Sequence, residues 1–254
     1  MEYGRDTILI DFNTQNGSGG PGGTWNVFAA PEDINGGFLM DSFGVQTPFR
    51  LNVAGTITDS ANFGAAGIFD NTNPNSLPAW ATSSSNNGAS GDYFYTSTSP
   101  GADTFILTIS GLTPGDQFSL DLLASRNDMA LPGGLYEYSL DGTAWFGFSV
   151  LNSDGTPATT DDWDTKNTKT QAFNIETQGY NLHRYMNVSD VTLTGSSLQI
   201  RVTDSNLEDA TITNSYTVLN AVQLTVEPVP EPSTMGLLGL GVGALLLRRR
   251  ARMS

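Results

Sequence analysis

The chain has 254 residues, of which 28 are glycine and 12 are proline, and only 15% are charged. It contains no cysteine, which excludes disulfides, cysteine-ligated metal sites and thiol catalysis. The net charge is −15, but four of the 11 basic residues follow Pro228, so residues 1–227 hold 7 basic and 25 acidic residues. A body with a charge of −18 repels nucleic acid and anionic lipid, and we expect no nucleic-acid partner.

The first half of the body predicts short β-strands joined by polar loops. Apolar or alternating runs predict strands at residues 7–12, 25–28, 37–43 and 49–58. The glycine-rich run from 13 to 24 is not followed by a helix pattern, so it does not predict a phosphate-binding loop. Residues 59–92 are rich in Asn, Ser, Gly and Pro, which favours a long loop insertion.

The second half of the body carries the clearest strand signals. Apolar residues alternate over 104–109 and again over 118–123, on either side of a Pro-Gly turn, which predicts antiparallel or sheet-crossing strands. Asp141-Gly142 lies between residues 136–140 and 143–150, and this pattern predicts a hairpin with a type I′ turn. Further strands are expected at 198–202 and 216–226, and Trp25 and Trp145 are expected in the core.

Three segments of the body together resemble a known architecture. They are 8–12 (Ile-Leu-Ile-Asp-Phe), 109–126 and 218–224, and they resemble the first, middle and last strands of the galactose-binding-domain-like family. The resemblance implies an all-β fold, a jelly-roll antiparallel β-sandwich with long loops, over residues 1–227. A fold resemblance does not establish a function.

The last segment, residues 228–254, differs in composition from the body. Pro230, Glu231 and Pro232 precede an uncharged, mostly apolar run over 235–247, and the run ends at Arg248, Arg249 and Arg250. Thirteen residues are fewer than the about 20 of a full transmembrane helix, and the arginines would stay on the cytoplasmic side. We expect a short C-terminal hydrophobic helix that enters the inner membrane transiently.

This order of Pro-Glu-Pro, apolar helix and basic end resembles the PEP-CTERM sorting signal of Gram-negative bacteria. The resemblance implies that an exosortase recognises and cleaves the tail near Pro230-Glu231-Pro232, and that the product reaches the cell surface or extracellular matrix. A permanent membrane anchor is the alternative, although an anchor needs neither the Pro-Glu-Pro nor the arginine stop. Residues 1–12 contain no signal peptide, so we expect the true start to lie upstream.

The side chains offer little for catalysis. His183 is the only histidine, and no Gly-x-Ser-x-Gly motif accompanies it. Acidic residues are so numerous that carboxylate pairs arise by chance, and such pairs do not indicate glycoside hydrolysis. We therefore predict no catalytic residues and no enzyme activity.

Two kinds of binding site are candidates. Side-chain oxygens in two loops suit a structural Ca²⁺ ion, and they belong to Asp70, Asn71, Asn73, Asp161, Asp162 and Asp164. Asx turns at the tips of these loops are the alternative interpretation. Aromatic and polar side chains in or near loops suit carbohydrate binding, and they are Trp80, Trp163, Tyr93, Arg126 and Asp128. For the two tryptophans, packing in the core is the alternative.

Together these features predict an exported, non-enzymatic surface or extracellular-matrix protein, with extracellular polysaccharide as its candidate ligand. A glycan-active hydrolase on the same scaffold and a purely structural matrix component are the alternatives. The sequence leaves the ligand and the oligomeric state open.

Overall fold

The computed structural model describes residues 5–12, 24–28, 30–55, 57–59, 80, 94–97, 104–124, 134–152, 155–157, 184–204 and 216–228. Almost all of its regular structure is β-strand, and the one short 3-10 helix in these ranges, η1, spans Pro31–Asp33. Within the same ranges no helix is long and apolar enough to cross a membrane.

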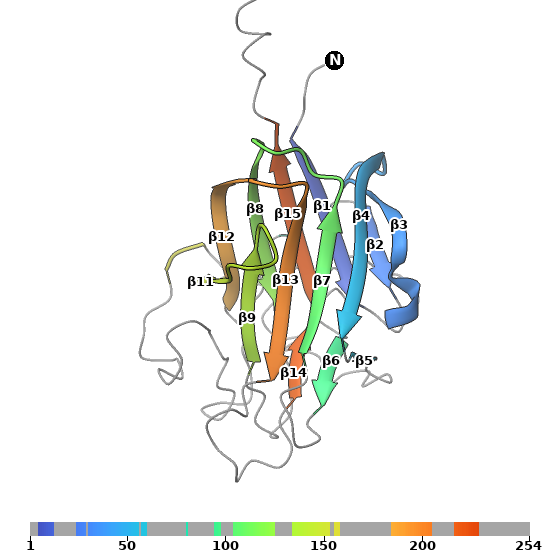
Figure 1. Cartoon of the computed structure of the whole chain (residues 1–254), viewed down its shortest axis with the longest axis vertical. Helices are drawn as coiled ribbons and strands as arrows, with labels where there is room; N and C mark the ends of the chain where they lie inside the picture. Colours follow the sequence, from blue (N-terminus) through green and yellow to red (C-terminus); the bar gives the residue numbers. More distant parts are fainter. Residues whose placement is uncertain are drawn as a thin grey trace, which may run out of the picture.

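Two six-stranded sheets form a sandwich (Figure 1). Sheet A has the order β11-β12-β8-β15-β1-β2, and its strands are β1 (Asp6–Phe12), β2 (Trp25–Phe28), β8 (Gln117–Leu123), β11 (Ser149–Asn152), β12 (Arg184–Thr192) and β15 (Ala221–Glu227). Sheet B has the order β10-β9-β13-β7-β4-β3, and its strands are β3 (Asn35–Met40), β4 (Gln46–Gly55), β7 (Thr104–Ser110), β9 (Gly134–Ser139), β10 (Phe146–Gly147) and β13 (Ser197–Asp204). A small third sheet, in the order β14-β6-β5, contains β5 (Thr58–Asp59), β6 (Phe94–Ser97) and β14 (Tyr216–Leu219).

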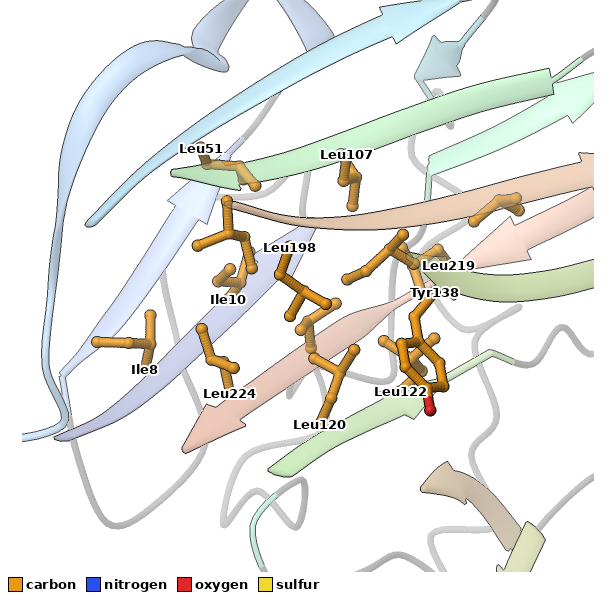
Figure 2. Close-up of a cluster of buried hydrophobic side chains, with 14 of the residues drawn as sticks. Ile8, Ile10, Leu51, Leu107, Leu120, Leu122, Tyr138, Leu198, Leu219 and Leu224 are labelled. Atoms are coloured by element: carbon orange, nitrogen blue, oxygen red, sulfur yellow. The ribbon is translucent and has the colours of Figure 1, made fainter. Parts of the chain in front are cut away.

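The sequence alternation explains how the two sheets share one core. Successive side chains of a strand point to opposite faces, so Phe105, Leu107 and Ile109 of β7 are all buried while the residues between them are half-buried. Figure 2 shows the result: Ile8 and Leu120 from sheet A meet residues of sheet B inside the sandwich, and the residues of sheet B that the figure labels are Leu51, Leu107, Tyr138 and Leu198. Burial of these apolar side chains is the main source of stability for a chain without disulfides.

The prediction of an all-β jelly-roll sandwich is confirmed. The Pro-Gly turn connects β7 in sheet B to β8 in sheet A, so of the two expected arrangements the sheet-crossing one is present. One pairing differs from a purely antiparallel sandwich, because β1 and β2 run parallel. The predicted C-terminal helix lies outside the described residues.

The hairpin predicted around Asp141-Gly142 forms, but the prediction of a type I′ turn is wrong. Tyr138 pairs with Phe146, so the connection is a wider loop than two residues. A type I′ turn needs positive φ at both central residues, and among the described non-glycine residues only Asp190 has one. The Asp141 carboxylate instead accepts hydrogen bonds from the backbone N–H groups of Ala144 and Thr143, at 2.9 and 2.7 Å. These bonds lower the pKa of Asp141 to about 2.

Candidate functional site

Sheet A carries a second hydrophobic cluster on the face that points away from the core. Ile8 and Ile10 of β1 point into the sandwich, so Leu9 and Asp11 point to the outer face. Leu9 packs there in a cluster whose other buried members are Trp25, Leu123 and Ala221, with Val27 and Trp80 against it. Trp25 is therefore buried as expected, but in this outer cluster rather than in the core between the sheets.

Trp80 links the outer cluster to β12. Its ring stacks on Trp25, with centroids 6.5 Å apart and an interplanar angle of 27°, and it meets Tyr185 edge-on at 6.4 Å and 84°. The indole Nε1 atoms of Trp25 and Trp80 are buried and have no hydrogen-bond partner in the part of the chain that the structure describes. A buried N–H without an acceptor costs free energy, so both indoles are held here by their apolar and aromatic contacts.

A row of three polar side chains crosses the same face beside the aromatic residues. Register places Asn187 of β12, Asp121 of β8 and Gln223 of β15 opposite one another. The Asn187 amide donates to Oδ1 of Asp121 at 2.7 Å, and the Gln223 amide donates to Oδ2 at 3.4 Å. All three side chains are half-buried, so they form the partly open floor of the outer face. We call these residues the polar row.

The charge of Asp121 determines which hydrogen-bonding groups of the polar row remain available to a ligand. Burial raises the pKa of Asp121 to about 6, while the Asn187 hydrogen bond and the Arg5 charge oppose this shift. The side chain is thus mostly ionised at neutral pH, and an ionised carboxylate only accepts hydrogen bonds. Both amides turn their NH₂ groups toward Asp121, which leaves their carbonyl oxygens to accept from a ligand.

This arrangement suits a ligand that combines hydroxyl donors with an apolar face. The polar row supplies acceptors, and Trp80 and Tyr185 supply aromatic surface at its border. Two further acids of the outer face are placed differently. Asp11 is fully buried, and Glu227 lies at the end of β15 with its Oε1 3.2 Å from Nε of Arg5.

Of the site residues predicted from the sequence, the structure describes only Trp80, which lies on the outer face of sheet A. The other carbohydrate candidates, Trp163, Tyr93, Arg126 and Asp128, lie outside the described residues. Also outside the described residues lie the Ca²⁺ candidates Asp70, Asn71, Asn73, Asp161, Asp162 and Asp164. The same holds for His183 and for the sorting residues Pro230 to Pro232 and Arg248 to Arg250. In the described ranges no group of three or more His, Asp or Glu side chains could hold a metal ion.

The sequence reasoning missed the polar row and Tyr185. One signal was available for Asp121, because it interrupts the apolar run of β8 at a position that alternation assigns to the outer face. No local signal marked Asn187 or Gln223, which lie 66 and 102 residues away from Asp121 along the chain. Strand pairing alone brings them to the carboxylate.

Several solved structures are similar to this chain at low identity and low TM-score. The enzymatically active domain of tailspike protein 4 from bacteriophage CBA120 is 14% identical, with a TM-score of 0.30 over 70% of this chain and 19% of that one. The ANX1 ectodomain from Arabidopsis thaliana is 12% identical, with a TM-score of 0.37 over 89% of this chain and 51% of that one. TmCBM61, solved with beta-1,4-galactotriose, is 8% identical, with a TM-score of 0.22 over 71% of this chain and 85% of that one.

These similarities are low and carry no argument about function. This chain spans about a fifth of the tailspike chain and about half of the ANX1 chain. No curated protein matches the sequence of this chain. Residues 228–250, however, match the model of the PEP-CTERM protein-sorting motif, so this β-sandwich carries a PEP-CTERM sorting signal directly after its last strand.

Proposed function

We propose that the protein is exported, processed by an exosortase at its tail and delivered to the cell surface or extracellular matrix, where its body binds polysaccharide. The sorting motif at residues 228–250 carries the first part of this proposal. The motif begins one residue after β15, so the whole sandwich precedes it as the cargo.

The sorting step is tested with two matched acid substitutions. Glu231→Ala alters the Pro-Glu-Pro, whereas Glu227→Ala removes an exposed acid four residues earlier, outside the matched motif. We expect Glu231→Ala to leave unprocessed protein in the membrane fraction and Glu227→Ala to be delivered like the wild type. Cell fractionation and the apparent mass of the product measure both effects. Unchanged delivery of Glu231→Ala would contradict recognition by an exosortase.

The polar row supports polysaccharide as the ligand of the body. Three polar side chains that lie side by side on β12, β8 and β15 can accept hydrogen bonds from several hydroxyl groups of one ligand. The acceptor character of the row and the acidic body favour neutral sugars over sulfated or uronic acid chains. The aromatic residues beside it offer the apolar contact that a pyranose ring prefers.

Binding is a better account of this face than hydrolysis. Glycoside hydrolysis needs two carboxyl groups that both reach the substrate, about 5–10 Å apart. Asp121 is partly accessible, but Asp11 is fully buried and Glu227 is engaged by Arg5 two rows away along the sheet. A glycan-active hydrolase would need a second carboxylate that reaches the substrate together with Asp121, and the described acid to test for that role is the exposed Asp190 in the bulge of β12, whose N–H donates to the Ser119 hydroxyl at 3.4 Å.

The ligand proposal is tested on a glycan array with the full chain, with and without Ca²⁺. Gln223→Ala removes a member of the polar row, and Gln46→Ala changes the same residue type on sheet B. Loss of one hydrogen bond to ligand predicts about tenfold weaker binding for Gln223→Ala, while Gln46→Ala should bind like the wild type. Absence of glycan binding in both conditions would refute the proposal, and equal binding by both variants would place the site elsewhere.

A further inference from the structure

The turn between β3 and β4, residues 41–45, is closed by hydrogen bonds of its own and exposes apolar side chains. The Asp41 carboxylate accepts hydrogen bonds from the backbone N–H groups of Phe43 and Val45, at 2.9 and 2.7 Å. The Asp41 N–H donates to the Val45 carbonyl at 2.8 Å, and Gly44 supplies the positive φ of 80° that closes the turn. The backbone of the turn is therefore held by Asp41, while the Phe43 side chain is left exposed.

The turn reverses the usual distribution of polar and apolar residues. Its acid, Asp41, is buried, whereas Phe43 is 83% exposed and Val45 is 61% exposed. Turns at the surface normally present polar residues, so two neighbouring exposed apolar side chains make this turn a candidate contact surface. Phe38, farther along β3, is 45% exposed and differs in that the Arg50 guanidinium lies over one face of its ring, 3.6 Å from the centroid.

The apolar turn lies at the end of the sandwich from which the sorting tail leaves. The Ser42 N–H donates to the Thr7 carbonyl at 2.7 Å, and Thr7 pairs with Thr225 near the end of β15. In Figure 1 the arrowhead of β15 and the start of β4 both lie at the upper end of the molecule. The turn and the exit of the chain thus share one end.

The length of chain after β15 brings this end close to the membrane. The strand ends at Glu227, and the apolar run of the tail begins at residue 235, so residues 228–234 are the whole connection. Seven extended residues span at most about 24 Å, which is less than the length of β4 measured at 3.3 Å per residue. A tail inserted in the bilayer would hold the sandwich with this end toward the lipid.

We propose that the turn of Phe43 and Val45 docks the body onto the lipid surface while the uncleaved tail is in the membrane. This inference rests on the membrane stage of the proposed function. Tethering raises the effective concentration of the turn at the bilayer, so two apolar side chains suffice for a contact that is lost after cleavage. Docking fixes the orientation of the body over the cleavage site and is reversible.

The charge of the body selects the kind of lipid. Residues 1–227 carry a charge of −18, so anionic headgroups repel the body and the contact depends on apolar insertion. The turn contains no lysine or arginine. Docking is therefore expected on zwitterionic phosphatidylcholine and is expected to be weaker when anionic phosphatidylglycerol is added.

The absence of cysteine from the chain allows a specific probe to be placed. The full chain is reconstituted in phosphatidylcholine vesicles after Val45→Cys is labelled with an environment-sensitive fluorophore. Ala54→Cys is the matched control, because it is also exposed and lies at the other end of β4, roughly 30 Å away. Lipids with a quencher in the acyl chain then report contact with the bilayer, and flotation reports insertion of the tail.

We expect a blue-shifted emission at position 45 and quenching at least about twofold stronger than at position 54. Phe43→Ser in the Val45→Cys background should abolish the difference, whereas Phe38→Ser should leave it unchanged, because the Arg50 guanidinium already lies over one face of the Phe38 ring. Equal, water-like emission at both positions in a chain that floats would overturn docking and leave the proposed function intact. A chain that does not float would overturn the membrane stage and docking together.

Discussion

Arg201 donates from Nε to Oε2 of Glu137 at 2.8 Å, and Glu137 is only 3% exposed. The two residues are opposite each other on β13 and β9, on the outer face of sheet B. The ring of Trp145 covers the guanidinium, with its centroid 4.1 Å from the carbon of the group. Trp145 therefore packs over an ion pair on this face, although the sequence suggested a place in the core.

Arg201→Met should strongly destabilise the fold, because it leaves the buried Glu137 carboxylate without its partner. Removal of one member of a buried pair costs about 3–5 kcal/mol, and the partial exposure of Arg201 favours the lower end. Arg50→Met is the matched control, since Arg50 is exposed and, among the described residues, contacts Phe38 and the Gly36 carbonyl. Urea denaturation should show a loss below about 1 kcal/mol there. Similar losses for both variants would contradict a special role of the Glu137 pair.

Two glycines of the β7–β8 turn allow the loss of stability caused by a backbone clash to be separated from the loss caused by a positive φ. Gly111 and Gly115 both have positive φ, 87° and 98°. A Cβ on Gly111 would lie 2.3 Å from the Pro48 carbonyl oxygen, whereas a Cβ on Gly115 has nothing within 4 Å. We expect Gly115→Ala to cost about 1–2 kcal/mol for its φ alone, and Gly111→Ala to cost at least about 2 kcal/mol more, because the backbone must move. Equal shifts in thermal unfolding would refute this account.

The strands could be predicted from the sequence because each one carries its own signal. Alternation over Phe105 to Ile109 depends only on which face of β7 is buried. The type I′ turn at Asp141 could not be predicted correctly, since an Asp-Gly pair supports several turn geometries. Here the Asp141 carboxylate binds the next backbone N–H groups and widens the loop.

The candidate site could not be predicted because it depends on pairing between distant strands. Asp121 acquires its partners only when β12 and β15 lie on either side of β8. Trp80 comes from a region that reads as a loop, and its place on Trp25 follows from the apolar side chains on the outer face of sheet A, which it helps to bury. Residue type suggested an aromatic contact for Trp80, but no spacing in the sequence indicated Tyr185 as its neighbour.

Asp141→Asn should weaken the β9–β10 loop in a manner that depends on pH. The pKa of Asp141 is lowered to about 2 by hydrogen bonds that its ionised form accepts, so its contribution to stability is present above its unfolded pKa of about 4. That contribution is lost as the pH falls through 2. Thermal unfolding should show a lower midpoint for the variant at pH 6 and nearly equal midpoints at pH 2. A difference that persists at pH 2 would mean that the ionised carboxylate is not the stabilising group.

Asp121 should give the opposite dependence of stability on pH. Burial raises its pKa to about 6, above the unfolded value of about 4, so between these values the folded state binds the proton and the unfolded state does not. The contribution of Asp121 to stability is thus full below about pH 4 and declines as the pH rises through 6. Asp121→Asn should remove this slope, so its unfolding free energy relative to the wild type should increase from pH 4 to pH 7.

Ligand binding at the polar row should change in the reverse direction over the same pH range. Ionised Asp121 holds the Asn187 and Gln223 amides with their carbonyl oxygens free to accept, and protonation turns the carboxyl into a donor that competes for them. Glycan affinity should therefore fall as the pH drops from 7 to 5, while stability rises. Calorimetric titration at both pH values measures the affinity, with Gln46→Ala as a control that should keep the pH dependence. Affinity that is constant from pH 7 to 5 would exclude Asp121 from the site, because no ligand contacting the row could be indifferent to its charge.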